Sequence, residues 1–285
     1  MPFPMSDVVI VIPCYNEEAR LAVDAYKAFL LENTMNLLFV DDGSSDGTLM
    51  VLERLQSNFP AQVQVLHLDK NMGKAEAVRR GIMQVCEGKG TNIVGFMDAD
   101  LSTPFEEIGY FLGGFANKKI EFVFGSRIAR IGARIKRYNY RHYFGRVVAT
   151  LVSVYLKIPI YDSQCGAKFF HTDFAVHVFR QPFVSRWLFD VEIFRRIALL
   201  GIDVENCALE LPLRTWIEKG GSKIALKDYL KLPFEFYKII HYYNSRRIKA
   251  YIYQAKAGAP QLRIIVQKEI EHAAQIKGNA LNEDD

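Results

Sequence analysis

Two aspartates separated by a single residue are the part of this sequence best suited to binding a metal ion. Asp98 and Asp100 flank Ala99 and follow directly after the apolar run 93–97. Mg²⁺ and Mn²⁺ prefer oxygen ligands and commonly take one or two carboxylates together with the phosphates of a substrate. A metal held there would neutralise a diphosphate that leaves as a bond breaks. Taken alone, the triplet is equally compatible with a solvated acidic loop.

Two other polar clusters have the composition of a nucleotide site. Residues 13–18 (PCYNEE) place Tyr15 where its ring could stack on a base, although acids here also complement the dipole of a following helix. Residues 41–48 (DDGSSDGT) contain several residues that cap a following helix. Capping does not explain the adjacent Asp41 and Asp42, whose mutual repulsion would need a compensating ligand, such as the NH group of a base.

A long span in the second half of the chain contains cations without acids. Such a cluster is usually a solvated basic face, but the lack of compensating acids favours anion binding. Tyr138, Tyr140, Tyr143 and Phe144 lie among the cations, which suits the headgroup boundary of a membrane. RNA fits less well, because no nucleic-acid-binding motif accompanies the cluster. The cations between Glu121 and Asp162 are Arg127, Arg130, Arg134, Lys136, Arg137, Arg141, Arg146 and Lys157.

The elements that position these residues alternate regularly in the first hundred residues. Apolar runs at 8–12, 37–40, 63–68 and 93–97 predict buried strands, and the segments 17–31, 45–55 and 74–86 have helical spacing. This alternation predicts an α/β fold with a mostly parallel, doubly wound sheet. In such sheets ligands bind at the carboxyl ends of the strands, so the three polar clusters should lie along one edge.

The remainder of the chain is less regular. The pattern is irregular, basic and aromatic at 122–161, more organised at 183–200 and 203–217, and helical at 226–256 and 262–277. We therefore expect a catalytic domain over 1–225 and a C-terminal extension of amphipathic helices over 226–285. Aromatic and basic residues alternate from 226 to 254, which suits a helix lying in a membrane interface. Packing on the catalytic domain or a contact in a homo-oligomer explains the same pattern equally well.

The overall composition is that of a globular protein with a large core. Half of the 285 residues are hydrophobic, and the net charge is only +4, which by itself does not indicate nucleic acid. The four cysteines are widely spaced, which predicts buried, reduced thiols. No apolar run approaches the ~20 residues that span a bilayer. We expect a cytoplasmic protein, either free or peripheral on the cytoplasmic face of a membrane.

The ordered motifs resemble a known enzyme family. VVIVIPCYNEE, LLFVDDGSSDGT, NMGKAEAVRRGI and GFMDADLSTP resemble the N-terminal half of family 2 glycosyltransferases with the GT-A fold. In the second half, GSR (125–127), DSQCGAK (162–168), RWLFDVE (186–192) and WIEKGGSK (216–223) resemble dolichyl-phosphate β-glucosyltransferases and their bacterial polyprenyl-phosphate relatives. The similarity spans roughly residues 7 to 225.

The resemblance implies roles for individual residues. Asp98 and Asp100 would hold the metal, and Arg127 and Lys223 would hold phosphate. Asp162 matches an active-site acid, and Asp190 lies with Glu192 in an acidic pair beside the sugar. Glu192 could instead pair with Arg195 or Arg196 on its own helix, and Lys168 could be a surface cation. The nucleotide-sugar contacts would come from Pro13, Tyr15, Asn16, Glu17, Val40, Asp41, Asp42, Lys74, Asp98 and Ala99.

The resemblance also implies a reaction. We expect transfer of a hexose, glucose from UDP-glucose, onto a polyprenyl or dolichyl phosphate with inversion and with Mg²⁺ or Mn²⁺. A phosphate acceptor is already anionic near neutral pH, so cations matter more than a base. The alternatives are a soluble family 2 enzyme acting on a polysaccharide or glycoconjugate hydroxyl, and a non-catalytic nucleotide-sugar-binding protein. A nucleotidyltransferase fits poorly, because PCYNE replaces the Gly-rich loop expected after its first strand.

Two departures from the resemblance bear on these expectations. The chain shows neither the N-terminal anchor of the eukaryotic glucosyltransferases nor the C-terminal spans of many bacterial relatives. Ser102 stands where mannosyl relatives often have Gln, so water or the donor phosphates would complete the metal's coordination.

Overall fold

A computed structural model describes residues 4–88, 90–136, 139–219 and 231–245, without the side chains of 139–144. The described strands form one seven-stranded sheet with the order β3-β2-β1-β4-β7-β5-β8, and a separate pair, β6 and β9. The strands are β1 (Val8–Cys14), β2 (Asn36–Asp41), β3 (Val63–His67), β4 (Ile93–Phe96), β5 (Phe122–Ser126), β6 (Arg134–Lys136), β7 (Lys168–His171), β8 (Ala208–Pro212) and β9 (Thr215–Ile217).

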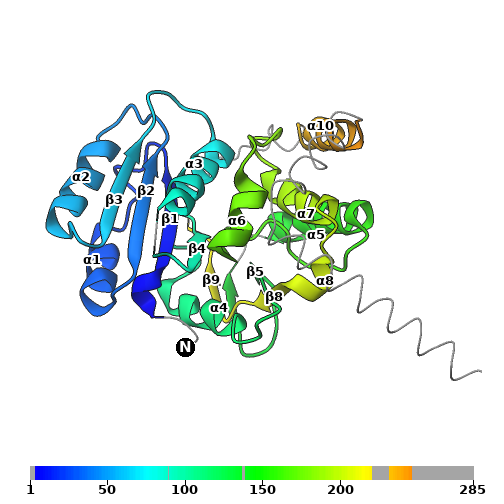
Figure 1. Ribbon diagram of the computed structural model, residues 1–285, viewed down its shortest axis with the longest axis horizontal. Coiled ribbons are helices and arrows are strands. Elements are labelled where there is room, and N and C mark those ends of the chain that lie inside the picture. Colours follow the sequence, from blue (N-terminus) through cyan, green and yellow to red (C-terminus); the bar gives the residue numbers. More distant parts are fainter. Residues whose placement is uncertain (1–3, 89, 137–138, 220–230, 246–285) are drawn as a thin grey trace, which may run out of the picture.

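The sheet confirms the predicted α/β fold. β1 pairs in parallel with β2 and β4, β2 with β3, and β5 with β8. Only β7 runs antiparallel to its neighbours in this sheet, β4 and β5. The central strands are continuous apolar runs because the sheet is covered on both faces. β7 therefore lies between the parallel strands β3, β2, β1 and β4, which are seen side by side in Figure 1, and the parallel pair β5 and β8.

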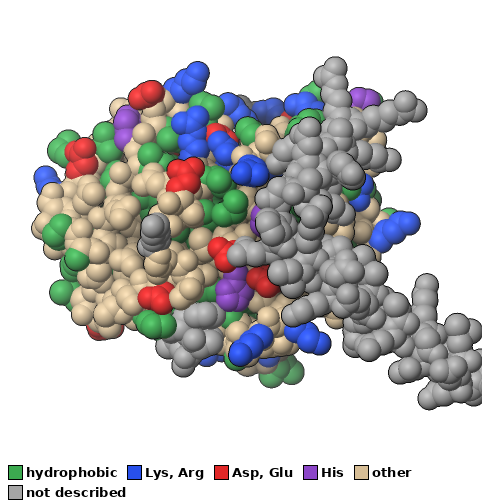
Figure 2. All heavy atoms as spheres, in the orientation of Figure 1, with side chains coloured by type: hydrophobic (Ala, Val, Ile, Leu, Met, Phe, Trp, Pro, Cys, Tyr) green, Lys and Arg blue, Asp and Glu red, His purple; other side chains and the backbone are tan. Residues whose placement is uncertain are grey.

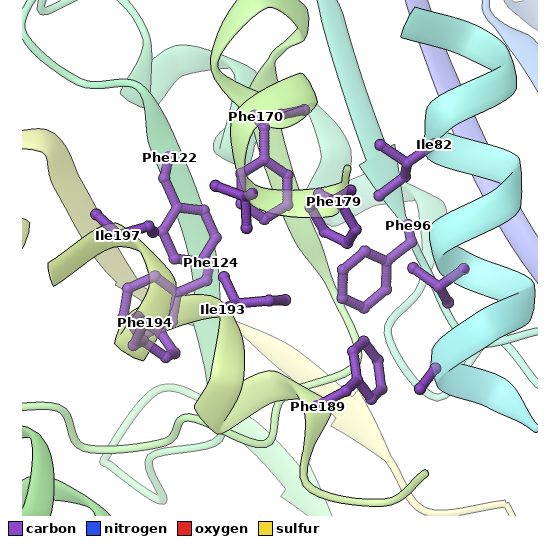
Figure 3. Packing of buried hydrophobic residues seen from close by; sticks show 14 of the residues in the cluster. Ile82, Phe96, Phe122, Phe124, Phe170, Phe179, Phe189, Ile193, Phe194 and Ile197 are labelled. Carbon is purple, nitrogen blue, oxygen red and sulfur yellow. The ribbon is translucent and has the colours of Figure 1, made fainter. Parts of the chain in front are cut away.

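Helices cover both faces of the sheet. α1 (Val23–Glu32), α2 (Thr48–Asn58) and α4 (Ile108–Gly114) contribute to one apolar cluster. The other cluster takes side chains from α3 (Lys74–Glu87), α5 (Asn139–Leu156), α6 (Thr172–Phe179), α7 (Phe189–Leu199), the short α8 (Val204–Cys207) and α10 (Leu232–Asn244). Figure 3 shows its aromatic residues, among which Phe122 lies against Phe170 and Phe194, and Phe96 lies against Phe189. Two short 3₁₀ helices, Met5–Asp7 and Phe105–Glu107, precede β1 and α4.

Two predicted helices begin later than their apolar spacing suggested. The first begins at Val23 rather than at residue 17, because Glu17 and Glu18 bond to the start of α2 instead. The second begins at Thr48, because Ser44 and Ser45 bond to Asn16. In both places these polar residues form hydrogen bonds between the loops at the edge of the sheet, so the helices begin only after them.

The prediction of an irregular segment at 122–161 is wrong. The structure has β5, β6 and the 18-residue helix α5 there. The helical period of α5 is obscured in the sequence because apolar residues occur on two sides. Val152 and Leu156 are buried, whereas Val147, Leu151 and Val154 are 58%, 56% and 71% exposed.

The C-terminal part is described only for α10. This helix confirms a helical element within 226–256 and packs against the catalytic core through Ile239 and Tyr243. The helix predicted at 262–277 lies outside the described residues, and the division at residue 225 stays a prediction. Among the described residues, no helix is long and apolar enough to cross a bilayer.

The cysteines and the surface charge agree with the composition. The four cysteines are free thiols, of which Cys86 is half-buried and the others are buried. Figure 2 shows one face of the molecule, on which basic side chains gather toward the top of the view and acidic ones are scattered.

Candidate active site

A cavity of about 600 Å³ opens beyond the carboxyl ends of β1, β2 and β4. This is the edge at which the sequence predicts a ligand site. Most of the predicted site residues line it: Pro13, Tyr15, Glu17, Asp42, Lys74, Asp98, Ala99, Asp100, Arg127, Asp162 and Asp190. Asn16, Val40 and Asp41 do not line it, and Lys223 lies outside the described residues.

The adjacent aspartates at the end of β2, Asp41 and Asp42, are both buried and have partners within the protein. Asp42 accepts hydrogen bonds from the backbone N–H groups of Met72 (2.7 Å) and Gly73 (2.8 Å). Burial raises the pKa of Asp42, against the opposing effect of these donors. Asp41 accepts from the Ser44 hydroxyl and lies 2.8 Å from His67 Nδ1. The sequence predicts that a ligand compensates the repulsion between these two carboxylates. In the structure, hydrogen bonds from the chain itself compensate it.

Asn16 supports the cavity from behind. It has a left-handed backbone (φ 49°), its N–H donates to Ser44 Oγ at 2.9 Å, and its Oδ1 accepts from the Ser45 N–H at 2.8 Å. The Glu17 N–H donates to Thr48 Oγ1 at 2.7 Å. These bonds join the loop after β1 to the loop after β2, and so they fix the direction in which Tyr15 and Asp42 meet the cavity.

The Asp98–Asp100 triplet leaves β4 at the centre of the cavity edge. The Tyr26 hydroxyl donates to the Ala99 carbonyl at 3.0 Å, which holds the backbone between the two aspartates. Asp98 forms an ion pair with Lys74 and lies directly against Gly166, where a β-carbon would collide with its carboxylate. Burial, and then the charge of Asp98, raise the pKa of Asp100.

These two carboxylates fit a divalent metal that is completed by substrate phosphate. Among the described residues, no group of three or more His, Cys, Asp or Glu side chains could enclose a metal ion. Two hard oxygen ligands at a cavity edge are what Mg²⁺ or Mn²⁺ takes from a protein when phosphates and water supply the rest. The Asp98 side chain is 40% exposed, so it is open to such a ligand.

Arg127 and Asp162, which both line the cavity, form an ion pair with each other. Arg127 Nε lies 2.6 Å from Asp162 Oδ2 and Nη2 lies 2.8 Å from Oδ1, a bidentate geometry. The Arg127 and Gln164 N–H groups also donate to Asp162, at 3.1 and 3.2 Å. Desolvation opposes the charge on Arg127, but Asp162 outweighs it and raises the arginine pKa. Asp162 thus fixes the guanidinium in its charged form.

Asp190 and Glu192 lie in the first turn of α7 but have different surroundings. Asp190 lines the cavity and pairs with Lys168 at 2.6 Å. Lys168 is fully buried, so its interpretation as a surface cation is wrong. Glu192 is also fully buried and accepts bonds from the Val184 and Ser185 N–H groups and the Tyr243 hydroxyl.

The sequence interpretation left several lining residues without a role. Arg186 and Trp187 line the cavity. They belong to the segment RWLFDVE (186–192), in which the family resemblance implies roles only for the two acids. Glu210 on β8 accepts the N–H groups of Tyr161 (2.9 Å) and Asp162 (2.8 Å) and so holds the loop carrying Asp162. No local signal marks Glu210, because its partners lie almost fifty residues away.

Comparisons with known proteins identify the family of this chain. The model of the glycosyl transferase family 2 matches residues 9–181. A dolichyl-phosphate beta-glucosyltransferase of Drosophila melanogaster is 31% identical over 239 residues, covering 78% of this chain and 70% of the relative. The enzyme of the same name from Saccharomyces cerevisiae is 30% identical over 246 residues, covering 78% and 71%.

Solved structures share the fold at lower identity. Glucosyl-3-phosphoglycerate synthase of Mycobacterium tuberculosis, in complex with Mn²⁺, UDP and glucosyl-3-phosphoglycerate, superposes with a TM-score of 0.57 at 16% identity, covering 83% of this chain and 79% of that chain. Mannosyl-3-phosphoglycerate synthase of Rubrobacter xylanophilus gives a TM-score of 0.53 at 15% identity, covering 90% and 76%. The chain belongs to glycosyl transferase family 2 and has the GT-A fold.

Proposed function

We propose that this glycosyltransferase moves glucose from UDP-glucose onto a polyprenyl or dolichyl phosphate, with inversion and with Mg²⁺ or Mn²⁺. The observation that carries the proposal is the cavity itself, which joins the Asp98–Asp100 pair to Arg127 and to one side of α5. The names of the relatives at about 30% identity over most of the chain support the choice of donor sugar and acceptor. A structural relative bound to Mn²⁺ and UDP-glucose supports the class of donor and metal.

The donor would bind along the edge formed by β1, β2 and β4. Tyr15 and Asp42 would meet the nucleotide, and Asp98 and Asp100 would meet the diphosphate through the metal. When bound, Mg²⁺ or Mn²⁺ would supply positive charge to the leaving UDP. Lys74, held by Asp98, adds a further cation at the same place.

The acceptor would be oriented by cations rather than activated by a base. A phosphate monoester is anionic near neutral pH and already nucleophilic, so no proton has to be removed from it. All the carboxylate oxygens of Asp162 accept bonds from Arg127 or Gln164, which makes Asp162 a support for Arg127. Among the described residues, Arg186 and Lys219 also line the cavity and make no ion pair.

α5 has the surface that a lipid acceptor requires. Gly145, Val148 and Ala149 line the cavity. Val147, Leu151 and Val154 recur at helical spacing on an exposed side of the same helix. A helix of this kind lies in a membrane interface with its apolar side toward the lipid, next to cations that attract anionic headgroups. We therefore place the enzyme peripherally on the membrane, with α5 at the entrance for the lipid phosphate.

An assay of UDP release tests the proposal. The full chain is incubated with UDP-glucose and Mn²⁺, with and without a short polyprenyl phosphate, and GDP-mannose serves as the alternative donor. We expect release that depends on both metal and lipid phosphate. Full activity with a soluble sugar hydroxyl would instead support a transferase acting on a polysaccharide or glycoconjugate. Donor binding without turnover on any acceptor would support a nucleotide-sugar-binding protein.

A further inference from the structure

Lys168 is a fully buried cation beside the cavity. It begins β7, the strand that runs antiparallel between β4 and β5, where it pairs with Phe96 on one side and Phe124 on the other. Its Nζ atom donates to Asp190 Oδ1 and to the Cys165 carbonyl, both at 2.6 Å. It also lies 5.6 Å from the centre of the Phe96 ring.

Stability alone does not explain this buried charge. Desolvating an ammonium group and a carboxylate costs several kcal/mol for each ion, and hydrophobic residues of the same volume often replace such pairs without loss. The strand neighbours of Lys168 are apolar, because Phe96 and Phe124 flank it and both belong to the apolar cluster, so an apolar side chain would fit there. The ion pair therefore points to a task for Asp190.

Asp162 and Asp190, two of the acids that line the cavity, differ in the carboxylate oxygens that remain available to a ligand. Both carboxylate oxygens of Asp162 accept hydrogen bonds from the protein. Asp190 uses only Oδ1, for Lys168, and among the described residues no hydrogen bond reaches its Oδ2. Asp190 is 6% exposed and this small exposed part lines the cavity.

We infer that Lys168 is a positioning residue, which orients Asp190 so that its Oδ2 accepts a hydrogen bond from a hydroxyl of the donor hexose. The inference rests on the proposed function, because it assigns that atom to the sugar of the donor. Its physical basis is rigidity: a carboxylate fixed by one buried partner presents its second oxygen in one direction. A hydrogen bond to a charged, pre-oriented acceptor discriminates strongly between hydroxyl arrangements.

The charges around the pair are compatible with this task. Lys74 on α3 lines the same cavity and pairs with Asp98. Desolvation opposes its charge, but the charges of Asp98, Asp190 and Asp100 outweigh this effect and raise its pKa. Lys168, which is fully buried, balances the charge of Asp190 through their ion pair. A sugar hydroxyl would thus meet an acid whose charge is already compensated, close to where the diphosphate would bind.

The test compares the binding of UDP-glucose and UDP by the full chain, with Lys168→Met, Asp190→Asn and the double variant. We expect each single variant to weaken UDP-glucose binding by about 10- to 100-fold, which is the loss of one hydrogen bond to a charged group, and to leave UDP binding unchanged. Because both changes remove the same interaction, the double variant should be no weaker than the single ones. Lys27→Met, which removes a partly exposed lysine of α1 outside the cavity lining, is the matched control.

Several results would overturn the inference. One is equal weakening of UDP and UDP-glucose by Lys168→Met, which would mean a general structural role. Another is unchanged UDP-glucose binding by Asp190→Asn, a variant of nearly the same volume that tests the site even if Lys168→Met does not fold. Since binding needs no acceptor, a failure to glucosylate polyprenyl phosphate would refute the proposed acceptor and leave this test intact. A wild-type chain that does not bind UDP-glucose would refute both.

Discussion

The two halves of the cavity wall differ in how several of their acids are held. On the side built from β1, β2 and β4, Asp42 and Asp100 accept backbone N–H groups, from Met72, Gly73 and Ser102, whereas Asp98 has a charged partner, Lys74. On the side built from residues 125–219, Asp162 and Asp190 are held by the charged side chains of Arg127 and Lys168. The charged residues lining the first side are Glu17, Arg20, Asp42, Lys74, Asp98 and Asp100, and those lining the second are Arg127, Asp162, Arg186, Asp190, Glu218 and Lys219.

This difference has an electrostatic consequence. Neutral N–H donors fix the carboxylates of Asp42 and Asp100 without cancelling their charge. Even with Lys74 paired to Asp98, the first side lines the cavity with four acids and two cations. The second side has three of each, and its charge is balanced. An excess of two negative charges matches one divalent metal ion, whereas a balanced wall selects its ligand by hydrogen-bond geometry and by the anion contacts of individual arginines. The first side is thus suited to a metal-bound diphosphate and the second to the sugar and the acceptor phosphate.

The largest effect should come from removing a carboxylate of the first side. Asp100→Ala should lower the turnover by on the order of 10³-fold, because the charge of the leaving diphosphate is then poorly compensated. UDP release with UDP-glucose, Mn²⁺ and polyprenyl phosphate measures this. Asp24→Ala on the exposed side of α1 is the control. Wild-type turnover by a folded Asp100→Ala variant would remove the metal role that distinguishes the two sides.

The next effect should come from the ion pair of the second side. Arg127→Lys keeps the charge but cannot make the bidentate contact with Asp162, so the cation would lose its fixed direction. We expect kcat/KM for polyprenyl phosphate to fall by roughly 10- to 100-fold, with unchanged binding of UDP. Steady-state kinetics with varied lipid and a separate UDP titration measure the two quantities. Arg130→Lys, at an arginine outside the cavity lining, is the control, and weakened UDP binding by Arg127→Lys would contradict the division between donor and acceptor sides.

The sequence predicts the first side far better than the second. β1 to β4 follow from continuous apolar runs, and each is followed directly by the polar loop that it positions, so local patterns suffice. The second side depends on long-range pairs. Lys168 meets Asp190 because β7 lies between β4 and β5, a register that no local pattern of the sequence indicates. The helical period of α5 was missed because its two apolar sides serve the core and the surface at once.

Substitutions on the exposed face of α5 should reduce membrane binding and transfer to the lipid acceptor, without changing the binding of the donor. Changing Val147, Leu151 and Val154 to serine removes apolar surface and should weaken binding to vesicles of anionic phospholipid by about 10-fold or more. Transfer to polyprenyl phosphate in vesicles should fall in parallel, while UDP-glucose binding stays the same. Co-sedimentation and donor titration measure this. Leu31→Ser and Met50→Ser, at exposed positions of α1 and α2, are matched controls, and equal losses in these variants would refute a specific membrane role for α5.

The smallest effect should come from the contact of α10 with the second side. The Tyr243 hydroxyl donates to Glu192 Oε2 at 2.6 Å and accepts from Arg196 Nε at 2.8 Å. Glu192 in turn accepts the N–H groups of Val184 and Ser185, in the segment that leads to Arg186 and Trp187. Tyr243→Phe removes one hydrogen bond to a buried carboxylate and should lower the free energy of unfolding by about 1–3 kcal/mol.

The position of that contact also predicts that its loss leaves the binding of UDP unchanged. Because Glu192 fixes the segment before α7, loosening it should disturb the wall around Arg186 and leave the β1–β4 edge intact. Thermal unfolding of Tyr243→Phe should therefore show a lower Tm, and UDP should raise that Tm by the same increment as in the wild type. Tyr242→Phe, at a neighbouring residue that is 41% exposed, is the control. A smaller stabilisation by UDP in Tyr243→Phe would show that the two sides are coupled through α7, and the contrast between them would then be one of charge alone.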